Sequence, residues 1–204
     1  MKIFAVGMNY ADHNKELHHT LISPEPAIFM KADSVLKDGK PFYLPDFSDE
    51  VHYETEVVIK IDRLGKNIDE QFAARYYDEV TVGIDFTARD RQRALRAARM
   101  PWELCKAFDN AAAIGTFVPL ASVGGDISRL TFRLDLNGRT VQRGQTVDML
   151  FSVDRIVAFV SRFFTLRMGD LIYTGTPSGV GPVAIGDHLE GFIGDRRLLD
   201  FYIR

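Results

Sequence analysis

Runs of β-branched and aromatic residues, separated by Gly, Pro, Asn or Asp, dominate this sequence. Such runs are typical of β-strands bounded by turns. They predict strands over residues 2–6, 27–31, 42–44, 53–61, 79–86, 113–120, 130–136, 140–142, 171–174, 188–193 and 198–203. The strand over 130–136 ends at Asn137-Gly138, a dipeptide that favours a two-residue hairpin turn because both residues accept positive φ.

Helical patterns are fewer. Apolar residues recur at helical spacing from Ile156 to Phe163, behind Ser152, a residue type that caps helices. Further helices are expected over 69–77 and 88–99, and a short one over 11–18. Because strands do not alternate regularly with helices, a doubly wound sheet is not expected. The sequence indicates a β-rich α+β fold.

No internal repeat or linker divides the 204 residues, so we predict one domain over 1–204, with the polar stretch 32–41 as a loop. Lys and Arg number 25 and Asp and Glu 28, and a net charge of −3 gives no electrostatic reason to expect nucleic acid or an anionic membrane as partner. One cysteine, Cys105, excludes an internal disulfide. No stretch approaches the roughly 20 apolar residues that span a bilayer, and a cytoplasmic protein is expected.

Two carboxylates share one face of the predicted strand 53–61. Glu54 and Glu56 lie two residues apart, or about 6.6 Å along a strand, and could converge on a hard divalent cation. A solvated strand face that carries two acids is the alternative. Asp85, among apolar neighbours late in another predicted strand, either has a charged partner or metal, or faces water at the strand end.

A histidine and a lysine are the other candidates for chemistry. His13 and Glu16 are spaced i, i+3 on the predicted short helix, so Glu16 could orient His13 as a general base, or the two could merely be neighbours on a surface helix. Lys106 lies in apolar company and is either held against an anion or reaches out to water. The glycine-rich segment 169–182 lacks the Walker, dinucleotide and nucleophile-elbow patterns. Its backbone N–H groups could hold a carboxylate, or it could be a plain turn.

The order of these residues along the chain resembles the fumarylacetoacetate hydrolase family, and most of all its short, single-domain acylpyruvate hydrolases and oxaloacetate decarboxylases. The motifs are Gly7-x-Asn9-Tyr10-x-x-His13-x-x-Glu16, Pro26-x-x-Phe29-x-Lys31, His52-Tyr53-Glu54-x-Glu56, Asp85-x-Thr87-Ala88-Arg89-Asp90-x-Gln92, Pro101-Trp102-x-x-x-Lys106-x-Phe108 and Gly169-Asp170-x-Ile172-x-Thr174-Gly175-Thr176-Pro177-x-Gly179-Val180-Gly181-Pro182. This chain departs from the family pattern in two places. Many relatives have a Pro-containing turn where this chain has residues 110–115, which contain no Pro, and several relatives carry Arg or Leu at the position of Met8.

The resemblance implies a mixed β-sandwich or roll, usually a homodimer, with one Mg²⁺ or Mn²⁺ in each active site. It assigns the metal-ligand positions to Glu54, Glu56 and Asp85, and places Lys106 beside the metal. His13 and Glu16 correspond to a dyad that activates water. Residues matching substrate-contacting positions are Gln92, Thr176 and Arg89.

The implied function is cleavage of a C–C bond in a small 2-oxo acid, by acylpyruvate or fumarylpyruvate hydrolysis or by oxaloacetate decarboxylation, through a metal-bound enolate. A 2-hydroxyhepta-2,4-diene-1,7-dioate-type isomerase of the same family, which needs only proton transfer, is the first alternative. A protein that binds 2-oxo acids without turnover is the second.

Overall fold

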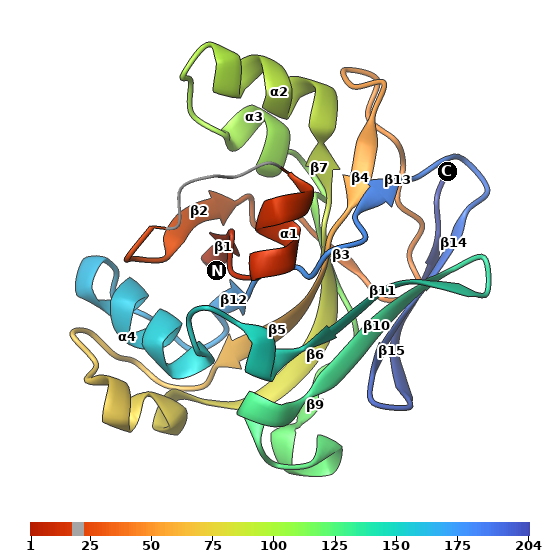
Figure 1. Ribbon diagram of the computed structural model, residues 1–204. Coiled ribbons are helices and arrows are strands. Elements are labelled where there is room, and N and C mark those ends of the chain that lie inside the picture. The colour runs from red at the N-terminus through yellow and green to blue at the C-terminus, as the bar shows by residue number, and fades with distance from the viewer. Residues whose placement is uncertain (18–22) are drawn as a thin grey trace.

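A computed structural model describes residues 1–17 and 23–204, and its ribbon is dominated by strands (Figure 1). The largest sheet is mixed, because β1 pairs with β12 and β3 with β8 in parallel, while its other pairs are antiparallel. Its strands are β1 (Ile3–Gly7), β2 (Ala27–Lys31), β3 (Val35–Lys37), β5 (Thr55–Ile61), β6 (Tyr77–Asp85), β8 (Ala112–Ile114), β9 (Val118–Pro119) and β12 (Leu171–Tyr173). Their order is β2-β1-β12-β5-β6-β8-β3, with β9 beside β6.

In the part of the chain that the structure describes, two smaller sheets and four α-helices complete the fold. The four-stranded sheet has the order β11-β10-β14-β15, from β10 (Thr131–Leu136), β11 (Arg139–Gln145), β14 (His188–Ile193) and β15 (Arg196–Tyr202). The three-stranded sheet has the order β13-β4-β7, from β4 (Val51–Tyr53), β7 (Thr87–Ala88) and β13 (Gly181–Pro182). The α-helices are α1 (Ala11–Glu16), α2 (Arg89–Ala97), α3 (Glu103–Lys106) and α4 (Val153–Phe163), and 3₁₀-helices span Glu70–Tyr76, Leu120–Val123, Ile127–Arg129 and Thr146–Asp148.

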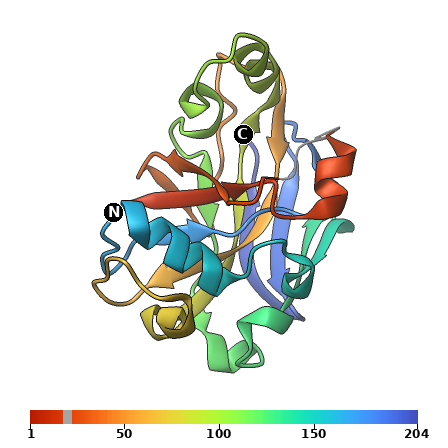
Figure 2. The ribbon, with the colours of Figure 1, turned by 60° about the vertical axis from the view of Figure 1, so that its left-hand side comes forward.

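The core lies on both faces of the large sheet, as the two-residue period of a strand requires. In β1, Phe4 and Val6 belong to the main cluster, which also contains the buried side of α4 and the inner side chains of the four-stranded sheet. Ile3 and Ala5 point the other way, into a smaller cluster with Tyr173. Figure 2 shows α4 beside the 3₁₀-helix over Glu70–Tyr76, against which it packs. The expected β-rich α+β fold is confirmed.

Local signals explain most of these elements. Asn137 and Gly138 both have positive φ, at 52° and 75°, and the predicted hairpin forms as β10 and β11. Ser152 caps α4, because its Oγ accepts a hydrogen bond of 3.2 Å from the Arg155 N–H. In the described residues no helix is long and apolar enough to cross a membrane.

Several boundaries differ from the predictions. The expected strand 53–61 is interrupted at Glu54, where the chain passes from the three-stranded sheet to the large one. The run 113–120 divides at Gly115, whose backbone approaches Leu198 so closely that a Cβ atom would lie 2.4 Å from the Leu198 carbonyl oxygen. The expected helix over 69–77 forms as a 3₁₀-helix over Glu70–Tyr76 rather than an α-helix, and Tyr77 already belongs to β6. Residues 42–44 contribute only a bridge from Phe42 to Ile203.

Short elements account for the remaining differences. The polar stretch 32–41 contains β3, and the four-residue helix α3 was not predicted. Both are too short to show a hydrophobic period in the sequence. The expected helix over 11–18 forms as α1, and its last expected residue, His18, lies outside the described residues.

Candidate active site

One end of the large sheet gathers the polar side chains singled out in the sequence. β1, β12 and β6 finish at this end and β5 begins there, because β1 and β12 are parallel and β5 is antiparallel to both of its neighbours. The residues that directly follow or precede these strand ends are therefore brought together although they are far apart in the chain. Figure 1 shows α2 and α3 near the three-stranded sheet, whose strands continue from these ends.

Three carboxylates meet at this end. Glu54 lies in the break between β4 and β5, Glu56 is the second residue of β5, and Asp85 is the last residue of β6. Each offers an oxygen that lies within 4.8 Å of those of the other two. The residues are 5%, 1% and 1% exposed, so neither a solvated strand face nor a water-facing strand end describes them.

Two buried lysines contact Glu54 and Asp85. Lys106, at the end of α3, places Nζ 2.7 Å from Glu54 Oε2 and 2.6 Å from Asp85 Oδ2, so it does not reach out to water. Lys31, the last residue of β2, donates hydrogen bonds to Asp85 Oδ1 and to the Lys106 carbonyl. Sequence reasoning assigned Lys31 no role. The sequence feature that could have indicated a buried role is the position of Lys31 directly after the apolar run 27–30.

Burial and charge set the ionisation of this cluster. Burial opposes the ionisation of Glu54, but Lys106 and Arg89 outweigh it and hold its pKa below the usual value. Burial and the charge of Asp85 raise the pKa of Glu56 well above its usual value, against the hydrogen bond from Gly175. Burial lowers the pKa of Lys31, whereas Asp85 and Glu54 overcome burial and raise the pKa of Lys106.

The carboxylate cluster has the composition of a site for a hard divalent cation. All three side chains supply oxygen, which Mg²⁺ and Mn²⁺ prefer, and they can approach a common centre. Burial and its neighbour Asp85 both disfavour the ionised form of Glu56 and raise its pKa, and a bound cation would favour that form. The residues present therefore fit one Mg²⁺ or Mn²⁺, and the donor set does not distinguish the two.

Arg89 and Gln92, from α2, extend the polar wall. Arg89 Nη2 donates to Glu54 Oε1 and Nη1 to Gln92 Oε1, each over 2.6 Å. Because the amide oxygen of Gln92 faces Arg89, the NH₂ group of Gln92 is the part left for a ligand. Arg89 Nε is buried and has no hydrogen-bond partner among residues 1–17 and 23–204.

A cavity with an empty volume of about 390 Å³, which includes open solvent, lies over the cluster. Both polar and apolar residues line it. Its lining consists of Val6, Gly7, Met8, His13, Leu17, Phe29, Glu54, Glu56, Asp85, Arg89, Gln92, Trp102, Lys106 and Thr176. All nine predicted site residues except Glu16 therefore line one cavity, whereas residues 110–115 do not line it.

Glu16 does not line the cavity but contacts His13, which does. His13 Nδ1 lies 3.2 Å from Glu16 Oε2, and His13 is 5% exposed, so the pair is not a loose contact on a surface helix. The other Glu16 oxygen accepts a 3.0 Å hydrogen bond from the Gly179 N–H. Glu16 thus joins α1 to the glycine-rich loop and fixes which nitrogen of His13 faces away from it.

Backbone N–H groups of the glycine-rich loop after β12 donate hydrogen bonds to carboxylates of the protein itself. The Gly175 N–H donates to Glu56 Oε2 over 2.6 Å. Gly175 has φ +103°, and a Cβ atom there would lie 2.7 Å from Asn9 Cβ, so only glycine fits this approach. The loop therefore holds carboxylates as predicted, and they are the protein's own, those of Glu56 and Glu16.

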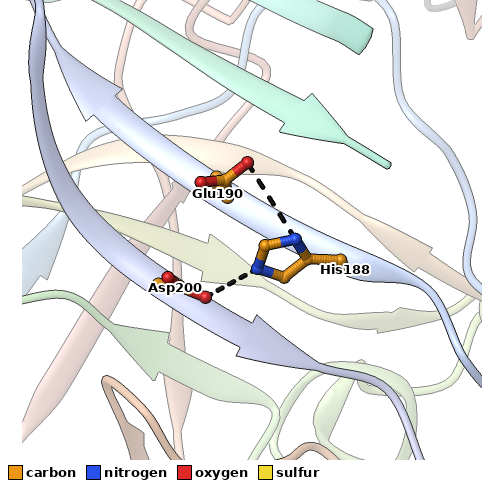
Figure 3. A group of neighbouring side chains, drawn as sticks. All are labelled: His188, Glu190 and Asp200. Carbon is orange, nitrogen blue, oxygen red and sulfur yellow. Dashed lines mark hydrogen bonds and ion pairs between the residues drawn. The ribbon is translucent and has the colours of Figure 1, made fainter. Parts of the chain in front are cut away.

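A second group of His and acidic residues lies on the four-stranded sheet, formed by His188, Glu190 and Asp200 (Figure 3). The two acids face different nitrogens of the imidazole ring, Asp200 at Nε2 over 2.7 Å and Glu190 at Nδ1 over 4.0 Å. Arg197 pairs with both acids as well. This arrangement is an ion-pair network in which the acids do not converge on one free nitrogen.

This chain is similar to known proteins both in sequence and in fold. The family model described as fumarylacetoacetate (FAA) hydrolase C-terminal matches residues 2–201. An oxaloacetate tautomerase of Escherichia coli is 38% identical over 92% of this chain and 86% of the relative, and a mitochondrial oxaloacetate decarboxylase of Dictyostelium discoideum is 38% identical over 93% and 87%. The crystal structure of a fumarylpyruvate hydrolase from Pseudomonas aeruginosa, in complex with Mn²⁺ and pyruvate, superposes with a TM-score of 0.90 at 35% identity, covering 100% of this chain and 89% of that one.

Proposed function

This chain belongs to the fumarylacetoacetate hydrolase family, and from that premise we propose that it is a divalent-metal-dependent enzyme that cleaves a C–C bond in small 2-oxo acids. One observation carries the proposal: Glu54, Glu56 and Asp85 converge in a buried cavity beside Lys106. Residues 1–204 act in this proposal as one catalytic domain.

The charges in the cavity support an anionic substrate. Lys31, Lys106 and Arg89 offset the three carboxylates. A divalent cation would then add two positive charges, which the two carboxylates of a substrate such as oxaloacetate would neutralise. Burying a balanced set of charges costs far less free energy than burying an unbalanced one.

The roles of the residues follow from their positions. Glu54, Glu56 and Asp85 would hold Mg²⁺ or Mn²⁺, which supplies a Lewis acid when bound. Lys106 brings a positive charge to the same place, where it stabilises the negative charge that develops on the C2 oxygen as the bond between C3 and C4 breaks. Arg89, Gln92 and Thr176 orient the substrate through hydrogen bonds.

The role of His13 depends on the chemical group at C4 of the substrate. If C4 is a ketone, His13, oriented by Glu16, takes a proton from water, and the water oxygen bonds to C4. The bond between C3 and C4 then breaks, its electron pair forms the enolate, and protonation at C3 gives pyruvate and a carboxylic acid. If C4 is a carboxylate, CO₂ leaves without attack by water, and the same protonation at C3 gives pyruvate.

Tautomerisation of oxaloacetate is the second candidate function. It moves one proton between C3 and the C2 oxygen and breaks no C–C bond, so the same charged cluster serves it. The similarity to an oxaloacetate tautomerase supports it. An isomerase of the family would likewise need only proton transfer.

Turnover with and without metal tests the proposal. The protein is incubated with oxaloacetate or acetylpyruvate in the presence of Mg²⁺, Mn²⁺ or EDTA, and reactions with metal but no protein serve as controls. Pyruvate formation is measured with lactate dehydrogenase, and the enol form is followed by its absorbance band. Metal-dependent formation of pyruvate supports C–C cleavage. Faster loss of the enol band without pyruvate supports the tautomerase, and binding without either reaction supports a binding protein.

We further propose the homodimer that the family resemblance implies. Light scattering on the purified protein should then give twice the 23.0 kDa mass of one chain. A mass equal to one chain at micromolar concentration would contradict it.

A further inference from the structure

Gln142 is the one buried residue of β11. The strand lies at the edge of the four-stranded sheet, and the rest of its side chains are exposed or half-buried. Gln142 is 1% exposed and does not line the cavity. Burying an amide costs free energy unless its donors and acceptor are satisfied, so the partners of Gln142 determine what it does.

The hydrogen bonds of Gln142 fix the orientation of its amide. Oε1 accepts from the Thr55 N–H over 2.9 Å, and Nε2 donates to Thr176 Oγ1 and to the Pro177 carbonyl, each over 2.9 Å. The Thr55 N–H can only donate and the Pro177 carbonyl can only accept. The amide therefore cannot be turned around without losing both bonds.

This orientation determines the direction of the Thr176 hydroxyl. Because Thr176 Oγ1 accepts a hydrogen bond from Gln142 Nε2, the Thr176 hydroxyl must donate its own hydrogen bond to another group. Among the described residues its other acceptor is the Pro177 carbonyl at 3.5 Å, which is too long for a strong hydrogen bond. Thr176 lines the cavity, so the proton is available to a ligand there.

We propose that Gln142 is a positioning residue that makes Thr176 a hydrogen-bond donor toward the substrate. The inference rests on the proposed function and narrows its substrate class. The group bound at Thr176 is then an acceptor, a carboxylate or carbonyl oxygen, rather than a hydroxyl or amine. The NH₂ group of Gln92, turned toward a ligand by Arg89, presents a second donor of the same kind.

The packing of the loop supports this role. Gly179, two residues beyond Pro177, lies so close to β11 that a Cβ atom would be 2.5 Å from the Val141 carbonyl oxygen and 3.3 Å from Gln142 Cγ. Gln142 also binds the backbone between Glu54 and Glu56 through Thr55. One side chain therefore joins the carboxylate strand to the loop that carries Thr176.

A double-mutant cycle tests the inference by steady-state kinetics with oxaloacetate. Thr176→Val should raise KM about tenfold, the effect of one hydrogen bond to a charged group, and Thr176→Ser should restore it. Gln142→Glu replaces the donating NH₂ with an acceptor that captures the Thr176 proton, so it should raise KM by a similar factor. In the Thr176→Val background, Gln142→Glu should change KM by less than about twofold, because coupled substitutions do not add.

Controls separate positioning from folding. Gln145→Glu, on the exposed end of the same strand, should leave KM unchanged, and Mn²⁺ affinity in Thr176→Val should match the native protein. If Gln142→Glu changes KM equally in the native and Thr176→Val backgrounds, the inference is wrong. An unchanged KM in Thr176→Val would also overturn it, and this second test does not depend on whether Gln142 variants fold. If the native protein turns over no 2-oxo acid, the proposed function fails, and Mn²⁺-dependent oxalate binding by the same variants tests the inference alone.

Discussion

Each buried acid of the cavity has a buried cation within hydrogen-bond distance, except Glu56. Lys31 and Lys106 contact Asp85, and Arg89 and Lys106 contact Glu54. Among the described residues, Glu56 accepts a hydrogen bond only from the Gly175 N–H. Removing one member of such a set leaves a buried charge without a partner, which costs more than the pair itself contributes.

His13→Ala should separate metal binding from water activation. His13 is held by Glu16 and touches none of the three acids through a hydrogen bond, so Mn²⁺ affinity should not change. Hydrolysis of acetylpyruvate should fall by about 100-fold or more, the typical contribution of a general base. Lys15→Ala on the same helix, where the Lys15 side chain is 78% exposed, is the matched control. Unchanged hydrolysis in His13→Ala would remove His13 from the mechanism.

The pKa of Glu56 predicts how metal affinity depends on pH. A cation binds the ionised carboxylate, and burial and Asp85 hold the pKa of Glu56 well above its usual 4.5. Mn²⁺ affinity should therefore rise with pH until the pH passes the raised pKa of Glu56, and binding below that pKa should release a proton. Titration calorimetry in buffers of different ionisation enthalpy measures both quantities.

The same shift predicts the opposite trend for the stability of the metal-free protein. A raised carboxyl pKa in the folded state adds stability below the unfolded value, and this contribution is lost as pH rises through the folded pKa. Glu56→Gln should remove both pH dependences, whereas Glu103→Gln, an exposed acid on α3, should keep them. A pH-independent Mn²⁺ affinity in the native protein would contradict the raised pKa.

At the scale of secondary-structure elements, the sequence predicted what local chemistry decides. The Asn137-Gly138 hairpin and the Ser152 cap formed as expected, because each depends on a few neighbouring residues. The break at Glu54 was not visible, since it arises where one strand leaves the three-stranded sheet for the large one. The spacing of Glu54 and Glu56 suggested that they belong together, but only tertiary packing brings Asp85 and Lys31 to them.

The glycine-rich loop offers a test of element packing. Gly179 and Gly186 both have left-handed φ, at 99° and 95°, but a Cβ atom at Gly186 would meet nothing within 4 Å. Gly186→Ala should cost about 1–2 kcal/mol for the backbone alone, which lowers Tm by about 2–4 °C per kcal/mol. Gly179→Ala adds the contact with Val141, so its Tm should fall further and its KM should rise. Equal Tm values in the two variants would show that the loop does not depend on close packing against β11.

At the scale of the whole molecule, the topology of the large sheet makes the cavity possible. β1, β12 and β6 end and β5 begins at the same end of the sheet, so residues from positions 6 to 176 line one cavity there. The helices contribute from outside the sheet, α1 with His13, α2 with Arg89 and Gln92, and α3 with Lys106. Because the charges come from so many elements, the occupancy of the cavity should affect the stability of the whole fold.

Metal should therefore change the melting temperature. A ligand that binds only the folded state at about 100 times its Kd stabilises it by about 2.7 kcal/mol. For a chain of this length, Mn²⁺ should raise Tm by about 5–10 °C over the protein in EDTA. Glu54→Ala should abolish this shift, whereas Glu190→Ala, which alters the other group of His and acidic residues, should keep it. A Tm shift that is lost in Glu190→Ala and kept in Glu54→Ala would place the cation on the four-stranded sheet. The absence of a Tm shift in the native protein would contradict metal binding by the three carboxylates.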